Sequence, residues 1–204
     1  RFLPRVAHRG LLSANVLVIQ GAKGSGKSAL FVAFQDRELL QQLALYAGVA
    51  AKQQQRLAHT DLMVGFDESM REAVSTGVQE LFGTFEARPR LDVHETLRCY
   101  WRALLCARIL DTHGADLLLT TYSVAPLPQL SQYPTVANAH ILSLDLEVQA
   151  ELVNWLKALM ERAKDLSREI WVLYDGLDAH LSTDPARRGP LVSALVDLWW
   201  TLRG

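Results

Sequence analysis

Residues 21–28 have the composition and spacing of a phosphate-binding loop that follows the Walker A pattern. Polyphosphate is bound by several backbone N–H groups that converge on it, and glycines permit the tight loop that aims them. Lys27 can reach the β- and γ-phosphates, and the Ser28 hydroxyl can ligate Mg²⁺. The residues predicted to bind ATP are Gly21, Ala22, Lys23, Gly24, Ser25, Gly26, Lys27 and Ser28.

A second chemically informative segment ends in two aspartates, of which Asp175 lies 148 residues after Lys27 and Asp178 lies three residues further on. Asp175 ends the apolar run at residues 170–174, which indicates a buried strand that delivers a carboxylate at its carboxyl edge. This position suits the Walker B role, in which Asp175 holds Mg²⁺ beside Ser28, and Asp178 would orient the attacking water. Alternatively, Asp-Gly-Leu-Asp is an ordinary turn with Asx-type hydrogen bonds.

The elements around the loop support the nucleotide interpretation. Residues 15–20 are apolar and partly β-branched, which predicts a strand before the loop, and a helix is expected from Ala29 to about Leu45. The phosphate-binding motif requires this order of strand, loop and helix. The α-helix that begins near Lys27 would add the positive end of its dipole to the site.

The sequence predicts mostly helices in the middle and at the end of the chain. Asp67 and Gly83 are predicted to start and stop one helix, and Asp92 with Glu95 resembles a capping box that starts a second, with Gly114 beyond its end. Further expectations are a short strand at 117–119, a helix capped by Ser143 or Asp145 that runs to about Lys164, and a last helix at 191–202 opened by Pro190. The expected fold is α/β: residues 1–204 form a parallel-sheet P-loop NTPase core flanked by helices, with a helix-rich insertion at about 36–168.

Composition limits the classes of function. The 21 Lys and Arg against 22 Asp and Glu give a net charge of −1, which does not indicate a nucleic-acid-binding domain. No run of about 18 apolar residues is present, so a membrane span is not expected. Cys99 and Cys106 are seven residues apart, which predicts free buried thiols and a reducing, cytoplasmic environment. The six histidines show no metal-ligand spacing.

The two motifs together resemble the STAND class of P-loop ATPases, particularly its NACHT and KAP modules. The resemblance covers residues 21–28 and the segment Val-Leu-Tyr-Asp-Gly-Leu-Asp at 172–178, in that order. It implies a module that binds ATP and Mg²⁺ and acts as a switch within a larger multidomain, oligomeric protein. Bacterial members of such families are frequent in stress and antiphage defence systems.

The chain departs from the resemblance at named places. NACHT modules usually continue with glutamate after the second aspartate, where this chain has Ala179. The separation of the motifs is closer to that of KAP-like proteins. Such folds also carry a further core strand, which is expected where this chain stops at Gly204, so the module is expected to be incomplete.

Alternatives follow from the same residues. A P-loop kinase would need a lid with several arginines, and Arg88 and Arg90 are few for that role. A non-hydrolysing module that holds ATP as a structural ligand stays open because of Ala179. Arg187 and Arg188 are either an arginine finger or ordinary solvated charges, and one of the adjacent Trp199 and Trp200 is expected at an interface.

Overall fold

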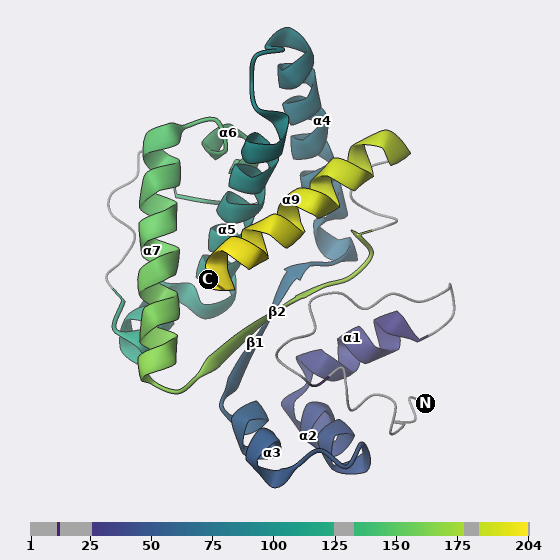
Figure 1. Cartoon of the computed structure of the whole chain (residues 1–204), viewed down its shortest axis with the longest axis vertical. Helices are drawn as coiled ribbons and strands as arrows, with labels where there is room; N and C mark the ends of the chain where they lie inside the picture. The colour runs from purple at the N-terminus through teal and green to yellow at the C-terminus, as the bar shows by residue number, and fades with distance from the viewer. Residues whose placement is uncertain (1–11, 13–25, 125–132, 178–183, 204) are drawn as a thin grey trace. The chain divides into compact units, whose positions relative to one another are not determined.

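The computed structural model describes residue 12 and residues 26–124, 133–177 and 184–203 (Figure 1). Within these residues the protein is a helix-rich α/β structure with a parallel sheet of two strands, which confirms the expected class. In chain order the elements are α1 (Lys27–Gln35), α2 (Arg37–Tyr46), α3 (Ala51–Ala58), β1 (Thr60–Phe66), the 3₁₀ turn η2 (Glu68–Met70), α4 (Arg71–Ala87), α5 (Val93–Tyr122), α6 (Ala139–Leu142), α7 (Leu146–Asp165), β2 (Glu169–Tyr174) and α9 (Pro185–Arg203). The strand predicted at 15–20 lies outside the described residues.

The chain divides into two compact units. Arg1–Val64 and Ser167–Asp175 form the first, called here the sheet unit. Gly65–Leu166 and Gly176–Gly204 form the second, called here the helical unit. The predicted insertion at about 36–168 contains most of the helices, but it also contains β1, a strand that the sequence did not predict.

In the sheet unit, the single helix predicted from Ala29 to about Leu45 is two helices. Asp36 separates α1 from α2: its backbone is extended, and its Oδ1 accepts hydrogen bonds from the backbone N–H of Glu38 at 2.8 Å and of Leu39 at 3.1 Å. This is an N-cap, which stabilises a helix start, so the prediction of one helix was wrong. The buried core of the unit consists of Leu12, Leu30, Phe34, Leu40, Leu43, Ala44, Ala47, Val49 and Leu57, with Leu62, Trp171 and Leu173 packed against it.

The two strands pair in parallel, and β2 is the strand predicted to precede Asp175. At the start of the pair, Arg168 donates two hydrogen bonds to the Asp61 carboxylate, from Nε at 3.0 Å and from Nη2 at 2.6 Å. Arg37 also reaches this edge through a hydrogen bond of 3.2 Å from Nη2 to the Thr60 carbonyl. These charged contacts fix the register of β1 at its N-terminal end.

The helical unit is organised around α5, which packs against α6, α7 and α9. One stripe of apolar side chains along α5 is buried, and it consists of Leu97, Tyr100, Trp101, Leu104, Leu105 and Ile109. The indole N–H of Trp101 donates a 2.7 Å hydrogen bond to the Leu191 carbonyl of α9. None of the helices in the described part of the chain is both long and apolar enough to cross a bilayer.

The predicted helix starts were largely right. Asp92 Oδ1 accepts from the Glu95 N–H at 3.0 Å, and Asp145 Oδ1 accepts from the N–H of Glu147 at 3.0 Å and of Val148 at 3.1 Å. Both are N-caps, and Asp145 holds this place at the start of α7. Asp67 caps the η2 turn, after which α4 begins at Arg71.

Three of the predicted helix boundaries were wrong, two at helix ends and one at a helix start. Gly83 lies inside α4, which ends before Pro89, because a residue that precedes proline is disfavoured in helical conformation. Gly114 lies inside α5, which continues through the expected strand at 117–119. Pro190 lies inside α9, which begins at Pro185.

Candidate nucleotide-binding site

The end of the predicted phosphate loop coincides with the start of α1. Gly26 is the N-cap residue, with φ of 89° and ψ of 14°, a left-handed conformation that glycine adopts without strain. Its carbonyl accepts the first helical hydrogen bond, from the Leu30 N–H at 3.0 Å. The glycine at this place in the motif is therefore explained by backbone geometry.

The first turn of α1 is a suitable surface for an anion. Among the described residues no side chain caps this helix, and its first turn contains no acidic residue. The first N–H groups of a helix have no intrahelical partners and carry the positive end of the dipole. Ser28 is exposed in this turn and Lys27 is half-buried, so both side-chain types needed for Mg-polyphosphate are at the helix start.

Helix α1 packs on strand β2 within the sheet unit. The ring of Phe34, which is buried, and the ring of Trp171 have centroids 6.1 Å apart and planes inclined by 58°. Figure 1 shows α1 beginning and β2 ending toward the same side of the sheet unit. The helix that starts at Lys27 is thus held against the strand that leads to Asp175.

Asp175 directly follows β2 and is half-buried. The next residue, Gly176, has φ of 70°, so the chain leaves the strand through a left-handed glycine. Asp178, Ala179 and residues 21–25 lie outside the described residues, so the predicted roles of Asp178 and of the phosphate loop stay predictions.

The acidic, histidine and cysteine side chains of the described ranges form no group of three or more that could hold a metal. A magnesium site of the predicted kind does not need one. Mg²⁺ bound with a nucleotide takes one or two protein ligands, and phosphate oxygens and waters complete its octahedron. Ser28 and Asp175, predicted as metal ligands, match this ligand count.

Arg187, one of the two candidates for an arginine finger, contacts its own helical unit. Its guanidinium carbon lies 4.9 Å from the centroid of the Phe82 ring. It also forms ion pairs with Glu86 at 3.7 Å and Asp184 at 3.3 Å. These contacts attach the start of α9 to α4, which is a structural role.

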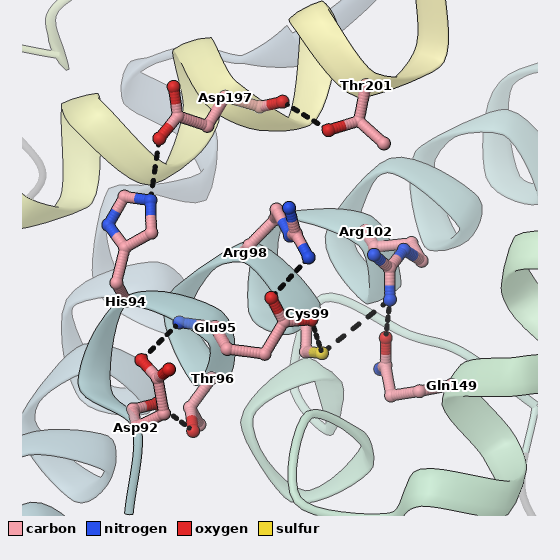
Figure 2. A network of polar contacts seen from close by, with 10 residues as sticks. All are labelled: Asp92, His94, Glu95, Thr96, Arg98, Cys99, Arg102, Gln149, Asp197 and Thr201. Atoms are coloured by element: carbon pink, nitrogen blue, oxygen red, sulfur yellow. Dashed lines mark hydrogen bonds and ion pairs between the residues drawn. The ribbon is translucent and has the colours of Figure 1, made fainter.

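A buried polar network in the helical unit was missed by sequence reasoning (Figure 2). Arg102 is 7% exposed and donates from Nη1 to Gln149 Oε1 at 2.8 Å and to Cys99 Sγ at 3.6 Å. Gln149 in turn donates from Nε2 to the Leu142 carbonyl at 3.0 Å. The signal that could have revealed the network is an arginine within the apolar stripe of α5.

The network joins helices and carries no evident chemistry. His94 Nε2 and Asp197 Oδ2, 2.6 Å apart, link α5 to α9 at its edge (Figure 2). Cys99 and Cys106 are free thiols, as predicted, and burial raises the pKa of both. A buried thiol with a raised pKa is a poor nucleophile, because the thiolate is the reactive form.

Comparison with known proteins gave no match to a protein-family model, a curated protein or a solved structure. Function is therefore argued from the residues and their geometry.

Proposed function

We propose that the protein binds ATP with Mg²⁺ through residues 21–28 and Asp175. One observation carries the proposal: Gly26, in a left-handed conformation, opens helix α1, which packs on the strand that leads to Asp175. In this arrangement Lys27 contacts the β- and γ-phosphates, and Ser28 and Asp175 hold the metal.

Hydrolysis is the second part of the proposal. Asp178 would position the attacking water, so the protein would be a Mg-dependent ATPase. The resemblance to STAND modules supports a regulatory role, in which γ-phosphate contacts bias the position of adjacent domains or subunits of a larger assembly. Bacterial defence or stress signalling in the cytoplasm is the setting in which such modules are frequent.

Nucleotide binding is tested by titrating the protein with ATP and Mg²⁺ in a calorimeter. Lys27→Ala should weaken binding by roughly 10- to 100-fold, the effect of losing a charge-assisted contact. Lys52→Ala, at an exposed lysine of α3 in the same unit, is the matched control and should bind ATP as the wild type does. Equal affinity of Lys27→Ala and Lys52→Ala would remove the phosphate-loop assignment.

Product analysis separates the three activities that the motifs allow. Phosphate released without an acceptor identifies an ATPase. ADP formed only when a small-molecule acceptor is present identifies a phosphotransferase. ATP that stays bound and intact identifies a structural, non-hydrolysing module. Ala179 favours this third activity, because NACHT modules usually have glutamate at that position.

A further inference from the structure

The α6–α7 connection exposes large apolar side chains beside acidic ones. Ile141 is 53% exposed, Leu144 37% and Leu146 82%, although all three are aliphatic. Glu147 and Glu151 are exposed in the first two turns of α7. These five residues are called the acidic corner.

The charge of the acidic corner is not compensated locally. No Lys or Arg occurs between residues 133 and 156. Asp145 is committed to its N-cap, and His140, from α6, is ion-paired with Glu80 of α4. Glu147 and Glu151 are spaced i, i+4, a like-charge pair that destabilises a helix by a few tenths of a kcal/mol unless an opposite charge approaches.

A second surface of the same helical unit has the opposite character. The turn between α4 and α5 contains Arg88, Pro89 and Arg90, all exposed, followed by the half-buried Leu91 and by Val93, which is 38% exposed. These five residues are called the basic turn. Asp92, which lies between Leu91 and Val93, is the one acidic residue within this segment. The turn is closed by a hydrogen bond of 3.1 Å from the Leu91 N–H to the Arg88 carbonyl.

The charges of the basic turn are also available for a partner. The acids in and beside this turn already have partners: Glu86 pairs with Arg187, and Asp92 caps α5. Across the described ranges no ion pair joins Arg88 or Arg90, or Glu147 or Glu151, to another residue. Each surface thus combines exposed apolar area with two charges of one sign.

We propose that the acidic corner binds the basic turn of a second copy of this chain. Clustered exposed apolar side chains mark interaction sites, and complementary charges orient the encounter and exclude wrong partners. Self-contact of two acidic corners is disfavoured because it would bring like charges together. The contact is therefore between unlike surfaces, and two copies that exchange both contacts close into a symmetric dimer.

The state of association is measured by sedimentation equilibrium of the whole chain at roughly 1–100 μM, at low salt and at about 0.5 M salt. The wild type should self-associate, and high salt should weaken the association because the charges are exposed. Leu146→Ser, at a side chain that contributes little to the core, should raise the dissociation constant about tenfold. Leu45→Ser, at a residue 62% exposed on α2 of the sheet unit, is the control and should not change it.

Charge reversal gives the decisive comparison. Glu147→Arg with Glu151→Arg, or Arg88→Glu with Arg90→Glu, should each weaken association, and all four changes in one chain should restore it. Folding is checked by circular dichroism for each variant. A wild type that stays monomeric overturns the proposal, and so does failure of the fourfold variant to recover association. Lys27→Ala should leave association unchanged, so the result is independent of nucleotide binding.

Discussion

The aromatic ring of Phe34 in α1 lies 6.1 Å from that of Trp171 in β2, measured between centroids. Phe34 is 4% exposed, and the tilted geometry of the two rings is favourable for an aromatic pair. Since α1 begins at Lys27 and β2 leads to Asp175, this pair sets the position of one predicted nucleotide-binding element against the other.

Phe34→Leu should weaken ATP binding without altering any residue that contacts the nucleotide. The change keeps an apolar side chain but removes the ring contact, which should lower the free energy of unfolding by about 1 kcal/mol. Calorimetric titration and urea denaturation measure the two effects. Phe82→Leu is the matched control: Phe82 forms an edge-to-face pair with Phe85 in the helical unit, 5.4 Å between centroids. Phe82→Leu should lower the free energy of unfolding by a similar amount and leave ATP affinity unchanged. A loss of ATP affinity in both variants would contradict the positioning role of Phe34.

Arg168→Ala should destabilise the sheet unit. The Asp61 side chain is 14% exposed, and the substitution removes both hydrogen bonds that Arg168 donates to it. The mostly buried Asp61 carboxylate would also lose the positive charge of the Arg168 guanidinium. We expect the free energy of unfolding to fall by about 1–2 kcal/mol, after allowance for partial exposure of the arginine. Asp165→Asn, at an exposed i, i+3 pair with Arg162, should shift the urea midpoint little. A similar shift in both variants would show that the pair contributes no more than a surface ion pair.

The thiols of Cys99 and Cys106 should resist labelling in the folded protein. They should also make the free energy of unfolding depend on pH in the alkaline range. Burial raises the pKa of Cys99 and Cys106, so the folded state keeps their protons at a pH where the unfolded state loses them. The unfolded state then binds fewer protons, and the free energy of unfolding falls as pH rises above about 9. Cys106→Ala should reduce this fall, measured by urea denaturation from pH 7 to 10. Rapid labelling of both thiols by a thiol reagent at pH 8 without denaturant would contradict their burial.

Asp178→Asn should slow ATP hydrolysis while ATP affinity stays close to that of the wild type. The amide keeps the size of the side chain but cannot orient water as a carboxylate does. Phosphate release under saturating ATP measures the rate, and Asp184→Asn, at the start of α9, is a nearby control. Unchanged turnover in Asp178→Asn would assign Asp178 to an ordinary turn.

The features that sequence predicted well depend on a few neighbouring residues. Asp92 and Asp145 were found because an N-cap is satisfied by N–H groups two or three residues away. Strand β2 was found because its apolar run is continuous. The predictions of a phosphate loop and of a metal ligand at Asp175 rest on the same kind of short pattern.

The features that sequence missed depend on distant contacts. Strand β1 contains Asp61 and Gly65, which interrupt its apolar pattern, and its partner β2 lies about a hundred residues away in the chain. Gly83, Gly114 and Pro190 are weak helix formers that nevertheless lie inside helices. Tertiary packing outweighs an intrinsic helix penalty of about 1 kcal/mol for a glycine and about 3 kcal/mol for a proline.

The polypeptide passes between the two units three times, after Val64, Leu166 and Asp175. During synthesis, the strand that pairs with β1 and the helix that covers Trp101 both emerge only after residue 166. The two units therefore complete their cores together, only once residues beyond 166 have been synthesised, and until then the apolar side chains of α5 that pack against α9 stay uncovered.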